Sequence, residues 1–338
     1  MSLAGTFGLS FLLGLILTPA SIRLAWRTGY LDHPAARKLH TAATALLGGA
    51  AVFLSGIVAW GALHLARRGA TEREALFLLG GAVIVLAIGL WDDRHGMDPW
   101  VKLSGQTAAA AVLLASGRLP DLGLPVPLDV GLALVALVAL MNAVNFLDNM
   151  NGMVAGLGAI TLVAFAAASA ARGAPGLAAA QLAFAGACAG FLPYNFPRAR
   201  IFLGDAGSLL LGYSLGASAV LAWAAAPPGW GRLGLLLMLG YPAFDLIFVV
   251  VNRLREGRKV YLGGRDHSNH RLASVLRCPI RTVLLMWSTT AALCASGLAV
   301  LLLNRPAPAL LLSGLWTILL FWSGRRLSSI PVPPSPPR

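Results

Sequence analysis

Paired carboxylates stand at the ends of apolar stretches in this sequence, where they would lie at a membrane boundary. Asp92 and Asp93 are adjacent at the end of one stretch, and Asp205 lies within Gly204-Asp-Ala-Gly-Ser at the start of another. Such carboxylates are costly unless a cation or a basic side chain neutralises them. Mg²⁺ prefers one or two carboxylates together with phosphate oxygens, and Lys102 follows closely enough to face the same pocket. Solvated helix ends, an N-cap at Asp205 and a snorkelling lysine are the alternatives.

Amide side chains are unusually dense in the segment Asn142-Ala-Val-Asn145-Phe-Leu-Asp148-Asn149-Met-Asn151-Gly152. Asn142 and Asn145 are three residues apart and would share one face of a helix. Polar groups inside an apolar helix usually point into a cavity, where amides and a carboxylate suit base recognition or metal ligation. Interhelical hydrogen bonds are the alternative. Gly152 permits a tight turn into the next helix.

Two charged segments carry groups suited to anions: Arg265-Asp-His267-Ser-Asn269-His270-Arg271 and Leu31-Asp32-His33-Pro34-Ala-Ala-Arg37-Lys38-Leu-His40. We expect the first to bind phosphate through His267, His270 and Arg271, because Zn²⁺ would need more imidazole or thiolate ligands. We expect Arg37 and Lys38 to guide anionic lipid headgroups. A merely solvated loop is the alternative for the first segment.

The elements that must carry these groups are membrane helices. The chain of 338 residues is 57% hydrophobic and 12% charged, whereas a soluble domain carries about 25% charged residues. We therefore predict an all-α polytopic membrane protein. Its single domain would cover residues 1–325, followed by a Pro-rich tail at 326–338. We expect eleven spans, at about 3–25, 46–66, 75–91, 101–117, 128–146, 153–171, 176–193, 206–226, 232–252, 282–303 and 307–323.

Charge sets the orientation of these spans. Of 26 basic residues, nineteen fall on the side that holds the charged segments described above. The positive-inside rule makes that side the cytoplasm, so the N-terminus is expected outside and the C-terminus inside. The acidic residues of the motifs gather on the same side, which indicates a site for a metal ion and an anionic substrate. No basic patch interleaved with aromatic residues supports a nucleic-acid partner, despite the net charge of +13.

Taken together, these segments resemble the polyprenyl-phosphate N-acetylhexosamine-1-phosphate transferase family, whose bacterial branches include WecA-type and MraY-type enzymes. The resemblance runs from about residue 29 to residue 275. It is carried in chain order by Asp32-x-Pro34-x-x-Arg37-Lys38-x-His40, Gly48-Gly49, Asp92-Asp93, Lys102, Asn142-x-x-Asn145-x-x-Asp148, Asn195, Pro197, Gly204-Asp205-x-Gly207-Ser208 and His267-x-x-His270.

The resemblance implies transfer of a sugar 1-phosphate from a UDP-sugar to undecaprenyl phosphate at the bacterial inner membrane. A homodimer is compatible with it. Asp205 and Asn145 would hold Mg²⁺ or Mn²⁺, and Asp92 or Asp93 would act on the lipid phosphate or contact the metal. The remaining residues would bind substrate: Lys102, His267, His270 and Arg271 the phosphates, Asn151 and Phe202 the uracil region, with Asn142, Asp148, Arg37 and Lys38 completing the site.

Several features depart from that family pattern. Asn151 stands where many bacterial members have Asp, and Asn269 replaces one His. The His-His-His-Phe-Glu run of MraY-type enzymes is absent, which argues against a muramyl-pentapeptide substrate. Two alternatives stay open. One is an ion-coupled transporter that uses Asp245, which lies inside an apolar stretch, together with the Asn-rich helix. The other is a catalytically impaired scaffold homologue.

Overall fold

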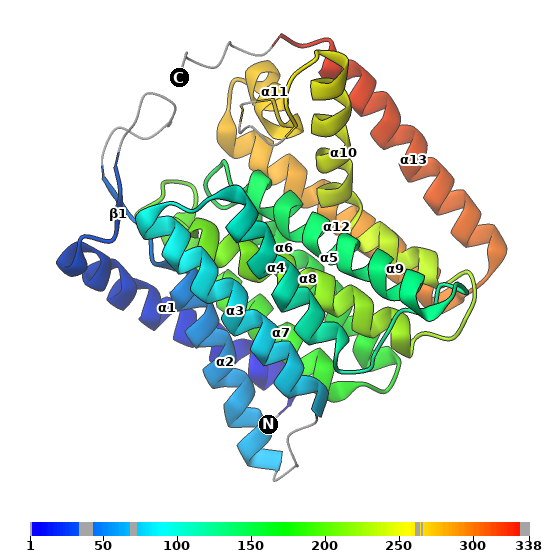
Figure 1. Cartoon of the computed structure of the whole chain (residues 1–338), viewed down its shortest axis with the longest axis horizontal. Coiled ribbons are helices and arrows are strands. Elements are labelled where there is room, and N and C mark those ends of the chain that lie inside the picture. Colours follow the sequence, from blue (N-terminus) through cyan, green and yellow to red (C-terminus); the bar gives the residue numbers. More distant parts are fainter. Residues whose placement is uncertain (1, 34–42, 68–72, 261–263, 265, 332–338) are drawn as a thin grey trace.

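The computed structural model describes residues 2–33, 43–67, 73–260, 264 and 266–331, and this part of the chain forms thirteen helices and one small sheet. The prediction of an all-α polytopic architecture is confirmed (Figure 1). The elements are α1 (Leu3–Thr28), β1 (Leu31–Asp32), β2 (Thr44–Ala45), α2 (Gly48–Arg67), α3 (Arg73–His95), α4 (Pro99–Leu114), α5 (Val126–Leu147), α6 (Met153–Ala171), α7 (Pro175–Asn195), α8 (Gly204–Ala225), α9 (Arg232–Met238), α10 (Gly240–Arg255), α11 (Ser268–Leu276), α12 (Pro279–Leu303) and α13 (Pro306–Ser328).

Eight of the described helices are long and apolar enough to cross a membrane, and α9 with α10 would make a ninth. The predicted number of eleven is therefore not reached by these criteria. The expected spans at 46–66 and 101–117 correspond to α2 and α4. The described apolar part of α2 covers only Gly48–Leu63, and α4 has 16 residues, which is short for a hydrocarbon core of about 30 Å.

The expected continuous span at 232–252 is broken. The axes of α9 and α10 meet at 65°, with Leu239 between them. Pro242 has no backbone N–H and cannot donate to the residue four positions earlier, which interrupts a helix at this point. As a result α10 leaves the line of α9 and extends beside α11 and α13, on the far side of the bundle from α1 and α2 (Figure 1).

The centre of the bundle is built from α6, α7 and α8. In the most apolar stretch of α8, 72% of the residues are buried, compared with 11% in α13. Small residues dominate the buried faces of these three central helices, and small residues let membrane helices approach closely. The peripheral helix α13 instead turns Leu311, Ile318 and Phe321 outward, as expected for a surface in contact with lipid.

Glycines fix the first turn of α8 against two neighbouring helices. A Cβ atom on Gly49 of α2 would lie 2.3 Å from the Gly207 nitrogen, and one on Gly89 of α3 would lie 2.3 Å from the Ala206 Cα. The backbone of α2 also donates to the segment before α8, from Gly49 N to Leu203 O at 2.9 Å. The start of α8, which carries Asp205, is therefore held in place by backbone contact.

Candidate active site

An ammonium group lies between two carboxylates from different helices at one end of the bundle. Lys102, in the first turn of α4, forms an ion pair with Asp92 of α3 at 2.8 Å and another with Asp205 of α8. The Lys102 Nζ also lies 3.5 Å from the Asn145 Oδ1 of α5. Four helices thus converge on one point, and one positive charge faces two negative ones. The sequence predicted that Asp92, Lys102, Asn145 and Asp205 share a site, and the structure brings them together.

Asp93 has a different environment from its neighbour Asp92. Its carboxylate accepts hydrogen bonds from the backbone N–H of Asp205 at 2.8 Å and of Ala206 at 3.1 Å. It therefore caps the N-terminus of α8 from another helix, where the helix dipole favours negative charge. Gly204 has φ +73°, and a Cβ atom there would lie 2.5 Å from the Asp93 carboxylate. Asp93 orients the turn that presents Asp205.

The oxygen atoms around Lys102 are suited to a hard divalent cation. Asn145 donates from Nδ2 to Asp205 Oδ1 and to Ser208 Oγ, both at 2.8 Å, so Asp205 and the Asn145 amide are already oriented. In the part of the chain that the structure describes, no three His, Cys, Asp or Glu side chains form a ready metal site. Mg²⁺ does not require one, since it commonly takes one or two carboxylates and completes its shell with phosphate oxygens and water. The residues present fit that ion.

Asn142 is not part of the carboxylate cluster. Its Nδ2 donates to Gln106 Oε1 at 2.6 Å and to Val138 O at 2.8 Å, and Gln106 Nε2 donates back at 3.4 Å. This reciprocal amide pair joins α4 to α5 one turn below Lys102 and Asn145. The interhelical alternative therefore describes Asn142 better than the expectation of direct substrate contact. The sequence did not indicate Gln106, because a lone Gln in an apolar helix does not reveal its partner.

Asp148 ends α5 and is half-buried, with its backbone N–H on Asn145 O at 3.2 Å. Burial raises the pKa of this carboxyl to about 8, and the negative charge of Asp205 adds to the shift. In the same turn, Asn149 Oδ1 accepts from Asn269 Nδ2 of α11 at 2.7 Å. This contact links the Asn-rich turn to the His-containing segment and was not foreseen. The donor in this contact, Asn269, stands at the position where the family pattern has a His.

The Asn-rich turn is also tied to the loop before α8. The predicted turn at Gly152 is confirmed by its φ of +76°, and its N–H donates to Asn195 Oδ1 at 2.7 Å. Asn195 in turn donates to Ile201 O at 2.8 Å, and Asn151 donates to Pro197 O at 3.1 Å. Phe202, half-buried, follows in this loop. The two segments expected to meet the uracil are therefore neighbours.

The His-containing segment is anchored at one end by a buried ion pair. Arg253 donates to both oxygens of Asp266, at 2.8 and 2.7 Å. Burial alone would raise the pKa of Asp266, but the hydrogen bonds and charge of Arg253 hold it well below its ordinary value. His267 follows directly, 4% exposed, with its ring 6.1 Å from that of Phe146 and 6.4 Å from that of His270. His267 thus lies next to the end of α5.

Arg271 points away from the cluster. Its guanidinium donates to the carbonyls of Leu327, Ser328 and Ile330 at 3.3, 3.1 and 2.8 Å, at the end of α13, and it lies over the ring of Phe248. The expected phosphate contact of Arg271 is not supported by this arrangement, because a guanidinium whose donors already bind carbonyls has little left for a phosphate. Arg37 and Lys38 lie outside the described residues.

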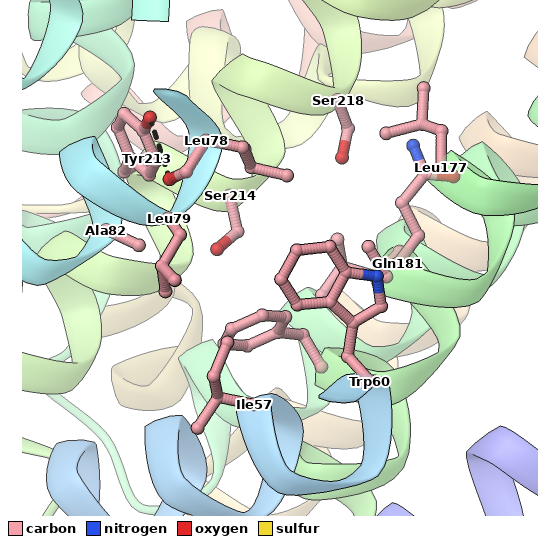
Figure 2. Close-up of a pocket in the computed structure, with 13 residues that line it drawn as sticks. Ile57, Trp60, Leu78, Leu79, Ala82, Leu177, Gln181, Tyr213, Ser214 and Ser218 are labelled. Carbon is pink, nitrogen blue, oxygen red and sulfur yellow. Dashed lines mark hydrogen bonds between the residues drawn. The ribbon is translucent and has the colours of Figure 1, made fainter. Parts of the chain in front are cut away.

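A crevice between α2, α3, α7 and α8 lies away from this cluster (Figure 2). It is lined mainly by apolar side chains, and Gln181 and Trp60 are among the lining residues. The lining residues of α8, from Tyr213 to Ser218, follow Asp205 by two or more helical turns. The crevice therefore lies deep in the bundle and is separate from the charged residues.

Fold and site together define a class: a polytopic membrane protein that gathers carboxylates, a lysine and amides at one end of its bundle. The chain belongs to glycosyl transferase family 4 of the MraY/WecA type. The model of that family matches residues 75–223, a range that contains Asp92, Lys102, Asn145 and Asp205.

Curated relatives extend the match to most of the chain. A decaprenyl-phosphate N-acetylglucosaminephosphotransferase of Mycobacterium tuberculosis is 34% identical over 304 residues, covering 78% of this chain and 74% of that protein. A probable undecaprenyl-phosphate N-acetylglucosaminyl 1-phosphate transferase of Bacillus subtilis is 32% identical over 279 residues, covering 79% and 76%. A phospho-N-acetylmuramoyl-pentapeptide-transferase of Desulforamulus reducens is 34% identical over 297 residues, covering 79% and 86%.

Proposed function

We propose that this protein transfers N-acetylglucosamine 1-phosphate from UDP-N-acetylglucosamine to a polyprenyl phosphate and releases UMP. The observation that carries the proposal is the contact of Lys102 with both Asp92 and Asp205, beside Asn145. Such a cluster can neutralise a phosphate with the lysine and a divalent cation with the carboxylates. The names of the mycobacterial and Bacillus relatives support the donor and the lipid acceptor.

The reaction requires one bond to form and one to break. An oxygen of the lipid phosphate attacks the β-phosphorus of the UDP-sugar, and the bond from that phosphorus to the bridging oxygen breaks, so that the oxygen leaves with UMP. The attacking phosphate is already ionised at neutral pH, which removes the need for an essential general base. Catalysis then depends on positioning and on neutralising charge.

The described residues divide this work. Lys102 donates to phosphate oxygens, and its release from one carboxylate accompanies that contact. Asp205 and Asn145, with Asp92, would hold Mg²⁺, which supplies charge neutralisation at the diphosphate when bound. Asp93 keeps the first turn of α8 in position, while Asn151, Phe202 and the segment around His267 border the space for the nucleotide and its phosphates.

We infer that α2 and α4 also cross the bilayer, which would give the eleven spans expected from the sequence, with the cluster on the cytoplasmic face. Their packing against α1, α7 and α3 within the bundle supports this. The transporter alternative loses its support, because Asp245 binds His267 and Ser268 rather than facing a pathway through the membrane.

The test is release of labelled UMP by purified protein in detergent with Mg²⁺ and undecaprenyl phosphate, from a panel of UDP-sugars that includes the muramyl-pentapeptide donor. We expect release from UDP-N-acetylglucosamine that depends on lipid and is abolished by EDTA. Asp205→Asn should reduce turnover by about 100-fold or more, as expected when a charge at the reacting phosphate is lost. Asp98→Asn, at an exposed N-cap of α4 that Asn also satisfies, is the matched control and should keep full activity.

Other outcomes separate the alternatives. Preference for the muramyl-pentapeptide donor would replace the proposed donor but keep the reaction. Absence of release from every donor, in a preparation with a sharp melting transition, would contradict the proposal and favour a catalytically impaired homologue.

A further inference from the structure

Asp245 is the buried acid that sequence reasoning left without a role. It lies in the second turn of α10, after the break at Pro242, and is 1% exposed. A buried charged side chain is destabilising unless its oxygens accept hydrogen bonds. Both oxygens of Asp245 have hydrogen-bond partners. Oδ2 lies 2.8 Å from His267 Nδ1, and Oδ1 accepts from the backbone N–H of Ser268 at 2.8 Å and from its hydroxyl.

These contacts give the two oxygens of the Asp245 carboxylate different roles. Oδ1 caps α11 by accepting the N–H of Ser268, and the Ser268 hydroxyl is also bonded to Tyr241 at 3.2 Å. Oδ2 can only accept, so the facing nitrogen of His267 must carry a proton. The proton on Nδ1 leaves Nε2 as the one ring nitrogen that can act elsewhere.

We infer that Asp245 is a positioning residue for transfer, which fixes the tautomer and orientation of His267 so that its Nε2 serves the substrate phosphates. The inference rests on the proposed function for its substrate. Among the residues that the structure describes, Asp245 of α10, His270 of α11 and the uncharged Phe146 of α5 face His267. The Phe146 ring packs beside the imidazole of His267. The orientation of the imidazole is therefore set by the Asp245 carboxylate at one edge and by Phe146.

An isosteric substitution separates the two functions of the carboxylate. In Asp245→Asn the side-chain oxygen stays with Ser268, which offers two donors, and the new NH₂ group therefore faces His267. Two donors cannot share one hydrogen bond, so Nδ1 must lose its proton and Nε2 must carry it. The cap on α11 is kept while the tautomer of His267 is reversed. A reversed tautomer in an intact site is known to cost a large part of catalysis.

The experiment has a spectroscopic arm and a kinetic arm. Protein labelled with ¹⁵N-histidine in proteoliposomes gives signals for six histidines, and the signal lost in His267→Gln identifies His267. We expect a protonated Nδ1 in the neutral ring of the unaltered protein and a protonated Nε2 in Asp245→Asn. We expect kcat/KM for the UDP-sugar to fall about 100-fold in Asp245→Asn. The double variant Asp245→Asn/His267→Gln should be no worse than His267→Gln alone.

A control variant and four outcomes make the test decisive. Asp98→Asn, at the exposed N-cap of α4 that Asn also satisfies, should keep the tautomer of His267 and change kcat/KM by less than about threefold. An unchanged tautomer in Asp245→Asn, or losses that multiply in the double variant, would overturn the inference. A reversed tautomer with unchanged kinetics would also overturn it. Absence of transfer by the unaltered protein with any donor, together with a reversed tautomer, would sink the proposed function and leave the hydrogen bond between Asp245 and His267 established.

Discussion

At the scale of single residues, two buried glutamines differ in their hydrogen bonding. Gln181 of α7 is 3% exposed, and neither its Nε2 nor its Oε1 has a hydrogen-bond partner among the described residues. Gln106 of α4 is 1% exposed and bonds reciprocally with Asn142. A buried polar group without a partner costs its full desolvation, whereas a paired one does not. The same residue type therefore has opposite consequences at the two positions.

We predict that Gln181→Leu raises the melting temperature of the detergent-solubilised protein and that Gln106→Leu lowers it. The expected changes in the free energy of unfolding are about 1–3 kcal/mol in each direction. Thermal unfolding followed by intrinsic fluorescence measures both variants under the same conditions. A lower melting temperature in Gln181→Leu would show that its amide has a partner, such as water or a lipid group, in the crevice of Figure 2.

A second prediction at this scale concerns Asp148, whose pKa is raised to about 8 by burial and by the charge of Asp205. The folded protein then binds this proton more tightly than the unfolded chain, so the contribution to stability is lost as the pH rises toward 8. We expect Asp148→Asn to melt at a higher temperature than the unaltered protein at pH 8. The two should converge near pH 4. Parallel pH profiles for Asp148→Asn and the unaltered protein would contradict the assignment.

At the scale of elements, the first turn of α8 depends on the absence of side chains on α2 and α3. A Cβ atom at Gly89 would meet the backbone of Ala206 at 2.3 Å, and backbone cannot give way as a flexible side chain does. We predict that Gly89→Ala displaces Asp205 and lowers kcat by about 100-fold, measured by UMP release. Gly61→Ala in α2, where a Cβ atom meets nothing within 4 Å, should keep activity and gain slightly from the higher helix propensity of alanine.

Part of this arrangement was predictable from the sequence. The apolar composition and the length of the apolar stretches predicted most of the helices. The clustering of Asp92, Lys102, Asn145 and Asp205 followed from their positions near helix ends on one face. The break between α9 and α10 was missed because the residues around Pro242 are as apolar as a straight span, although proline was a signal for it. The partners of Asn142, Asp245 and Arg271 could not be derived, since each is a contact between distant segments and the residue type alone allows many partners.

At the scale of the whole molecule, the arrangement predicts which loops face the cytoplasm. Ser329, at the end of α13, and Leu124, between α4 and α5, are exposed and should lie on opposite sides. Of the three cysteines only Cys278 is partly exposed, while Cys188 and Cys294 are buried. In a Cys278→Ser background, we expect an impermeant maleimide to label Ser329→Cys only in inside-out vesicles and Leu124→Cys only in right-side-out vesicles. The reverse pattern would place the carboxylate cluster outside.

The hydrogen bonds from Arg271 to the end of α13 have a practical consequence for the design of shortened versions of the protein. Its guanidinium is 4% exposed and depends on carbonyls of residues 327 to 330. A shortened version that stops at residue 326 would remove these three acceptors and leave Arg271 with the Asp266 carbonyl and the Glu256 carboxylate. A buried donor left without its acceptor costs about 1–3 kcal/mol. Because α11 also carries Asn269 and His270, trimming the chain for crystallisation should stop no earlier than residue 331. The melting temperatures of versions ending at 326 and at 331 would show the difference directly.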